Sequence, residues 1–167
     1  MAKKTATPQD TLERALILEK EGKDYFLQAS EHTDNELAKR TFQTLSARHD
    51  RHAERIELAN RALERQAVPD IEQPAAPRPL FEEIMRHIEQ STSPTARNIN
   101  ELRDAIVYST KLRDVYAHLA LIAREEWEVR LYSGLRDDEE ALKLTLADSL
   151  NYLRSNFEIS QLPRAER

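Results

Sequence analysis

Four of the seven prolines in this 167-residue chain lie close together, between Val68 and Leu80, in the stretch VPDIEQPAAPRP. Proline has no backbone N–H and clashes with the preceding helical turn, so a helix cannot run through this stretch. Proline-rich segments are instead extended and semi-rigid. Helical patterns occur on both sides of it, so the sequence predicts two helical halves joined by a long connection.

The composition of the chain also favours helices. Glycine occurs only twice, at Gly22 and Gly134, whereas Ala, Leu, Glu and Arg are abundant. These four residue types are strong helix formers, so we predict an all-α protein. The shortage of glycine excludes glycine-rich phosphate loops, and no nucleotide cofactor is expected.

Capping and breaking residues give an expected order of elements. We predict a single domain over residues 1–167, with a helical hairpin at 8–66, a proline-rich connection with one short helix at 67–94, a second hairpin at 95–160 and a tail at 161–167. The second hairpin is expected to break at Ser133 and Gly134, between helices at 95–132 and 138–160. Four long helices with one long connection are compatible with a crossover bundle or with an up-down-up-down bundle.

Three polar residues stand on the apolar stripes of the first two predicted helices. Steps of three and four residues place Glu19 one turn after Leu16, and His49 and His52 in line with Leu45. Burying an ionised carboxylate without a partner is costly. A carboxylate and two imidazoles in one core layer would avoid that cost by sharing a metal ion or a proton, and imidazole binds iron, zinc, copper and nickel.

The other candidate residues are expected to lie outside any functional site. His87 and His118 have no ligand partner at helical spacing, so we expect them at the surface or its boundary. His32 is expected at the end of the first helix, where a cationic ring complements the helix dipole. Glu126 belongs to a run of charged residues that is typical of a solvated helix face.

The segment at 15–56 resembles the first hairpin of rubrerythrin-like proteins in the ferritin-like superfamily. Its stretch LEKEGKDYFLQA contains Glu19 and Gly22 in the arrangement of that family's first metal-binding motif. Its stretch FQTLSARHDRH aligns His52 with the family's metal-binding histidine and His49 with its bridging glutamate. The resemblance covers about a quarter of the chain and implies a ferritin-like four-helix bundle with a long crossover.

The second half of the chain does not repeat these ligands. A di-iron bundle draws a Glu and a Glu-x-x-His from each pair of helices. The corresponding positions here fall on Ser109 or Thr110 and on Leu150 and Leu153. The resemblance therefore implies a half site that holds one ion of iron, manganese or zinc. Cysteine is absent, so neither a rubredoxin centre nor another iron–sulfur cluster is expected, and no haem is expected.

Two functions follow as hypotheses. The first is a metal-binding protein with residual iron or peroxide redox chemistry on a small oxidant, although the missing ligands argue against a complete di-iron oxidoreductase. The second is a non-catalytic helical assembly or interaction module that has lost its di-iron site. The resemblance also implies a homodimer, with Leu131, Tyr132 and Leu135 either in the dimer face or in the core.

Charge and hydropathy exclude other classes of partner. The chain carries 30 acidic and 25 basic residues, a net charge of −5, so binding to nucleic acid is not expected. No stretch approaches the roughly 20 apolar residues that span a bilayer, so no membrane association is expected. The N-terminal residues do not form a signal peptide, and the absence of cysteine suits the cytoplasm, where we expect the protein.

Overall fold

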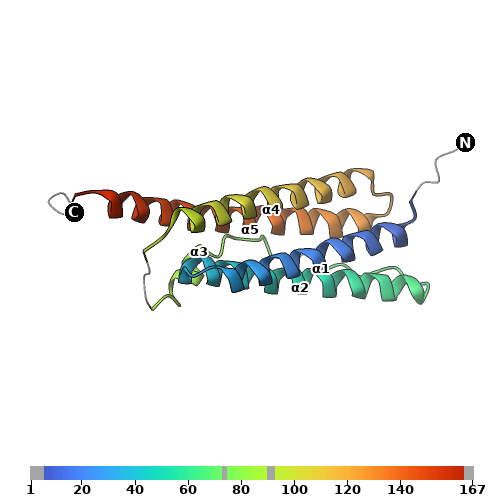
Figure 1. Ribbon diagram of the computed structural model, residues 1–167. Helices are drawn as coiled ribbons and strands as arrows, with labels where there is room; N and C mark the ends of the chain where they lie inside the picture. The colour runs from blue at the N-terminus through green and yellow to red at the C-terminus, as the bar shows by residue number, and fades with distance from the viewer. Residues whose placement is uncertain (1–5, 73–74, 90–92, 164–167) are drawn as a thin grey trace, which may run out of the picture.

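The computed structural model describes residues 6–72, 75–89 and 93–163, and this part of the chain is all-helical, as predicted. Its helices are α1 (Pro8–His32), α2 (Glu36–Glu64), α3 (Phe81–Met85), α4 (Ala96–Ile122) and α5 (Glu126–Gln161) (Figure 1). Within the described residues, no helix combines the length and the apolar character that crossing a bilayer requires.

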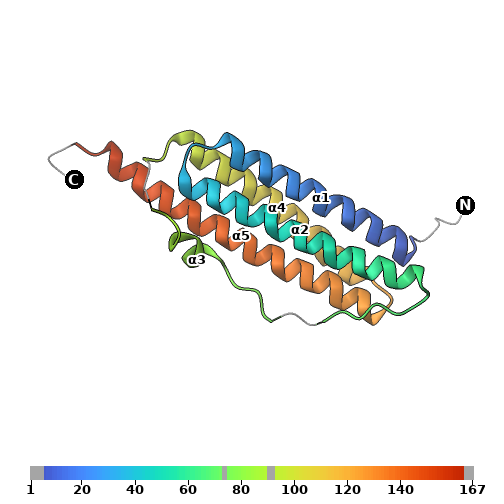
Figure 2. The same cartoon turned by 90° about the horizontal axis from the view of Figure 1, so that it is seen from below.

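The four long helices pack as two antiparallel pairs. Helix α1 packs on α2 and α4 packs on α5, and the two pairs meet where α2 contacts α5 and α1 contacts α4. The connection after α2 returns along the length of the bundle before α4 begins (Figures 1 and 2). Helices α2 and α4 therefore run in the same direction, which excludes the up-down-up-down alternative.

Side-chain caps fix where the helices begin. Thr7 and Asp10 form a capping box at the start of α1, with Pro8 in its first turn. The side chain of Asn35 accepts a hydrogen bond from the backbone N–H of Ala38 at 3.0 Å and so caps α2. These side chains satisfy backbone N–H groups that have no partner within the helix, which is why Thr and Asn stand at these positions.

The predicted break at Ser133 and Gly134 is wrong, because both residues lie inside α5. The chain turns earlier, where the carboxylate of Glu128 accepts hydrogen bonds from the backbone N–H groups of Arg124 and Glu125 at 3.3 and 3.1 Å. A single glycine costs a helix only about 1 kcal/mol relative to alanine, so burial on both sides of Gly134 carries the helix through it.

Two apolar clusters divide the core along the bundle. One includes Phe26 of α1 and Phe42 of α2, and the other includes Leu12 of α1 and Ile56 of α2. Residues of α5 contribute to both clusters as well. Polar side chains occupy the layer between the two clusters.

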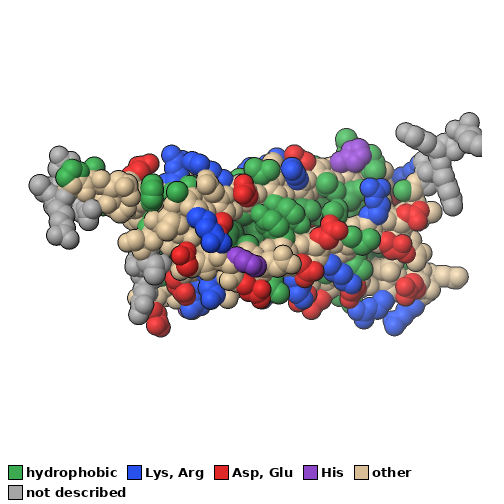
Figure 3. All heavy atoms as spheres, in the orientation of Figure 1, with side chains coloured by type: hydrophobic (Ala, Val, Ile, Leu, Met, Phe, Trp, Pro, Cys, Tyr) green, Lys and Arg blue, Asp and Glu red, His purple; other side chains and the backbone are tan. Residues whose placement is uncertain are grey.

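Leu131, Tyr132 and Leu135 are fully buried in the second of these clusters. They pack in the core of the bundle, so they are not a surface for a second copy. On the face drawn in Figure 3, charged side chains of both signs are interspersed, and hydrophobic side chains gather between α4 and α1. The stacked rings of Tyr25 and Tyr108, 4.2 Å apart, join these two helices.

Helix α3 is the short helix expected within the connection, and it lies against α2 and α5. Its Ile84 is buried in the first apolar cluster. Just before it, the backbone N–H of Leu80 donates to the hydroxyl of Thr145 at 2.8 Å. This buried hydrogen bond attaches the connection to α5.

Candidate metal centre

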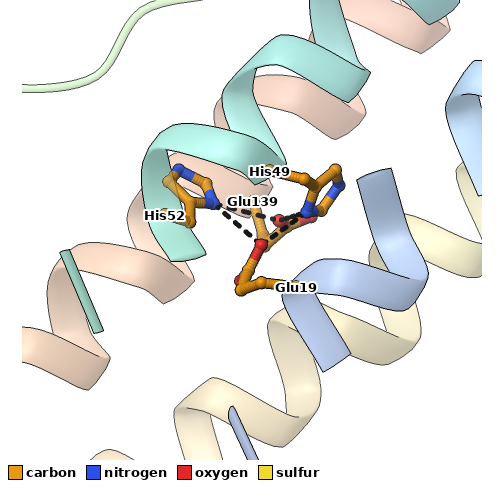
Figure 4. Close-up of side chains that lie close together, drawn as sticks. All are labelled: Glu19, His49, His52 and Glu139. Atoms are coloured by element: carbon orange, nitrogen blue, oxygen red, sulfur yellow. Dashed lines mark hydrogen bonds and ion pairs between the residues drawn. The ribbon is translucent and has the colours of Figure 1, made fainter. Parts of the chain in front are cut away.

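Four buried side chains meet in the polar layer between the two apolar clusters (Figure 4). They are Glu19 of α1, His49 and His52 of α2, and Glu139 of α5. Each offers one ligand atom, and these four atoms lie within 4.8 Å of one another. Their relative exposure is between 0% and 3%, so bulk water does not reach them. The structure brings the three sequence-predicted residues together and adds a fourth.

The distances between the nitrogen and oxygen atoms suit a shared cation. Nδ1 of His52 lies 3.3 Å from Oε2 of Glu19 and 3.8 Å from Oε1 of Glu139. Nδ1 of His49 lies 3.6 Å from Oε1 of Glu139 and 2.6 Å from Oε2 of Glu19. Atoms that each lie 2.0–2.2 Å from one ion are about 3–4.4 Å apart. Three of the four distances fall in that range, and the fourth is a direct hydrogen bond.

Glu139 gives the strongest indication of a ligand. Within the described part of the chain, neither of its carboxylate oxygens has a hydrogen-bond partner, and neither does Nδ1 of His52. Buried polar atoms in folded proteins nearly always have a partner, so an unpartnered buried carboxylate needs an explanation. A donor set of two carboxylates and two imidazoles fits one ion of iron, manganese or zinc.

The pKa values of the two buried carboxyl groups are shifted in opposite directions. Burial alone would raise the pKa of Glu19, but its contacts with His49 and His52 outweigh burial and lower the pKa to about 2. Burial raises the pKa of Glu139 to about 7, and the charge of Glu19 acts in the same direction. In the absence of an ion, Glu19 is the permanent anion of the pair and Glu139 gains and loses a proton near neutral pH.

Tyr116 of α4 completes the surroundings of Glu19. Its hydroxyl donates to Oε1 of Glu19, whose other oxygen is held by His49. Burial, followed by the nearby carboxylate, raises the pKa of Tyr116 well above 10, so the phenol stays protonated and remains a donor. Of the two positions aligned with a ligand on this helix, Ser109 is fully buried and its hydroxyl has no hydrogen-bond partner within the described residues, whereas the hydroxyl of Thr110 donates to the backbone carbonyl of Ile106 at 2.8 Å.

Asp138 and Arg55 hold the outer edge of His52. Nε2 of His52 lies 3.3 Å from Oδ2 of Asp138, and Arg55 donates to the same oxygen at 3.0 Å. Burial would lower the pKa of His52, but Asp138 and Glu19 outweigh it and raise the pKa to about 10. A carboxylate on one ring nitrogen directs the other toward the centre, as is common for histidines that bind metals.

Leu150 and Leu153, which the resemblance aligns with ligand positions of the last helix, pack in an apolar cluster, as expected of leucines that cannot coordinate a metal. That alignment missed Glu139 as the carboxylate of this helix. The error arose because the misplaced break put Glu139 in the first turn of a helix, within a run of acidic residues that is typical of a solvated face. A continuous α5 would have placed Glu139 on an apolar stripe, since Leu135, Glu139 and Leu142 follow one another at steps of four and three.

The remaining candidates lie outside the centre. His87 and His118 are exposed, as predicted, and His32 lies in the last turn of α1, also as predicted. Glu126 is exposed at the start of α5 and pairs with Arg130.

Comparisons of the chain with family models, with curated proteins and with solved structures give no match. Any function of the centre therefore has to be argued from its geometry.

Proposed function

We propose that this chain binds one ion of iron, manganese or zinc through Glu19, His49, His52 and Glu139. The observation that carries the proposal is the carboxylate of Glu139, which is buried, has no hydrogen-bond partner among the described residues and faces two imidazoles. An ionised Glu139 beside Glu19 is costly in a dry core, and a divalent ion would balance both charges.

The arrangement also supports a relation to rubrerythrin-like members of the ferritin-like superfamily. Glu139 and Leu142 lie one turn apart on α5, as His49 and His52 do on α2. A complete di-iron bundle has a Glu-x-x-His on both of these helices. Leu142 is a core leucine that cannot coordinate a metal, so we propose one ion rather than two. A homodimer is expected from the same relation.

The chemistry of such a centre depends on which ion it holds. An iron or manganese ion would supply electrons to a small oxidant such as a peroxide. The chain itself orients the ligands. Tyr116 holds Glu19, Asp138 holds His52, and the apolar clusters on both sides keep bulk water away.

A non-catalytic helical module is the second candidate. The 2.6 Å hydrogen bond between His49 and Glu19 favours it, because this contact satisfies two of the buried groups without an ion. The polar layer would then serve to fix how the helices pair, a role that some buried polar groups have. In this case the ligands of the proposed centre would bind no metal.

Elemental mass spectrometry on protein purified without a polyhistidine tag tests the proposal. The wild-type chain should carry about one metal ion, either as purified or after incubation with iron, manganese or zinc and removal of the excess. The His49→Ala/His52→Ala double variant should carry none. The matched control is His32→Ala/His118→Ala, which removes two exposed histidines and should keep the ion.

Two results would overturn the proposal. One is a wild-type chain that stays free of metal under every loading condition. The other is a double variant that still binds as much metal as the wild type. Because removal of two buried histidines can unfold a protein, Glu139→Gln is measured as well. It keeps the shape of the side chain and should lower metal affinity in a folded bundle.

A further inference from the structure

A pocket of about 800 Å³ lies between the bundle and the returning connection. Its inner wall comes from α2 and α5, and its outer wall comes from the connection that Figure 2 shows running along the bundle, together with α3. Pockets for small organic ligands have volumes of roughly 300–1,000 Å³. The space is therefore large enough for such a molecule, and far larger than an inorganic ion needs.

Four arginines line this pocket. Arg48, Arg51 and Arg55 are three or four residues apart on one face of α2, and Arg78 belongs to the connection opposite. Arg55 is engaged by Asp138. The other three make no hydrogen bond or ion pair within the described part of the chain. Their guanidinium groups are therefore available to a ligand.

Apart from Asp138, the carboxylates that line the pocket form no ion pair with these arginines within the described residues. Asp138 already contacts Arg55 and His52. Asp70, Glu72 and Glu83 are exposed to solvent on the connection and α3, and no ion pair joins them to the arginines within the described residues. The face of α2 thus presents two unpaired positive charges to the pocket.

Apolar side chains form much of the remaining wall. Leu58 of α2 lies one turn after Arg55 and is 61% exposed to solvent. Ile71 and Leu142 line the same space. Covering exposed apolar surface with an apolar ligand is favourable in proportion to the area removed from water. A guanidinium group matches a carboxylate in a bidentate pair. The pocket therefore combines sites for an anionic head group and an apolar body.

We propose that this pocket binds a small organic carboxylate with an apolar body. The head group pairs with Arg48 and Arg51 from α2 and with Arg78 from the connection, and the body covers Leu58 and Ile71. This proposal does not depend on a metal ion. His52 and Asp138 line the inner wall, so the ligand lies beside the edge of the metal centre.

Isothermal titration calorimetry with sodium octanoate tests this inference. Octanoate should bind at one saturable site per chain, at least tenfold more tightly than octan-1-ol, which lacks the charge, and than sodium acetate, which lacks the apolar body. The titration is run on metal-free and on metal-loaded protein. If octanoate binds to the metal-free protein, the inference about the pocket stands even when the proposed metal function fails.

Variants locate the site. Arg48→Gln/Arg51→Gln should weaken octanoate binding at least tenfold, and Arg78→Gln should weaken it at least threefold. Arg14→Gln/Arg103→Gln, which removes two exposed arginines of α1 and α4 outside the pocket, should change affinity less than twofold. The inference is overturned if no saturable binding occurs, if octan-1-ol binds as tightly as octanoate, or if the control pair weakens binding as much as the pocket pair.

Discussion

Gly22 of α1 lies directly against the imidazole ring of His49 on α2. A Cβ atom at position 22 would be 2.9 Å from Nδ1 and 3.0 Å from Cε1 of that ring, which is closer than real Cβ contacts. The same ring also stacks on Phe26, one turn further along α1, with ring centroids 5.3 Å apart. The missing side chain of Gly22 is therefore what allows His49 to enter the polar layer.

Gly22→Ala should consequently harm the centre. Alanine is the better helix former, but its methyl group would displace the His49 ring, and overpacking of this kind costs about 1–3 kcal/mol. We expect a lower free energy of unfolding in urea and weaker metal binding in a direct titration. Gly134→Ala is the control. Gly134 is a half-buried position inside α5 with ordinary helical φ, where alanine should stabilise by about 0.5–1 kcal/mol.

Glu139→Gln should act in opposite directions on metal binding and on the stability of the metal-free protein. The folded-state pKa of Glu139 is raised from an ordinary 4.5 to about 7, mainly by burial. The stability that this shift contributes is complete below about pH 4.5 and is lost as the pH rises through 7. A glutamine side chain cannot ionise, so the variant's free energy of unfolding relative to wild type should rise by about 1–3 kcal/mol between pH 4.5 and 8.

Urea unfolding of chelator-treated protein at several pH values measures this difference. Glu13→Gln removes one exposed carboxylate of α1 and controls for the change in net charge. In a parallel titration, Glu139→Gln should bind metal at least tenfold more weakly, because an amide is a poorer ligand than a carboxylate. A stability difference that stays constant over the pH range would contradict the raised pKa.

Asp138→Asn tests the outer edge of the centre. The variant loses the carboxylate that contacts Nε2 of His52, so the ring is no longer held with Nδ1 toward the cluster. Losses of this kind typically weaken metal affinity 10–100-fold. Competition with a chelator of known affinity measures the change. Asp137→Asn is the neighbouring control, since Asp137 is exposed and pairs with Arg136, and unchanged affinity is expected for it.

Tyr116→Phe removes the hydroxyl that donates to Glu19 and keeps the ring that packs in the core. A hydrogen bond to a charged group contributes about 1.5–3 kcal/mol, so the metal-free variant should be less stable by that amount. Tyr108→Phe is the matched control on the same helix, because the hydroxyl of this half-buried tyrosine makes no hydrogen bond within the described part of the chain. Equal effects of the two substitutions on urea unfolding would show that the Tyr116 hydroxyl is not important for stability.

Local pattern was sufficient to find most of the centre. Glu19, His49 and His52 could be placed on buried helix faces because a helix repeats every 3.6 residues, and the first hairpin has clear caps and breaks. The same pattern failed for Glu139. It lies where the signals from Gly134 and from the acidic run at 137–140 conflict with the apolar spacing of its neighbours.

Residue pattern alone was enough to predict that this chain is helical, that a proline-rich connection separates two hairpins, and that a carboxylate and two imidazoles face the core of the first hairpin. Packing between helices was needed to establish that α5 runs unbroken through Gly134, because burial on both sides outweighs the cost of one glycine. Packing also determines which side chains from separate helices meet. Glu139 and Asp138 reach the two histidines only because the crossover places α5 beside α2.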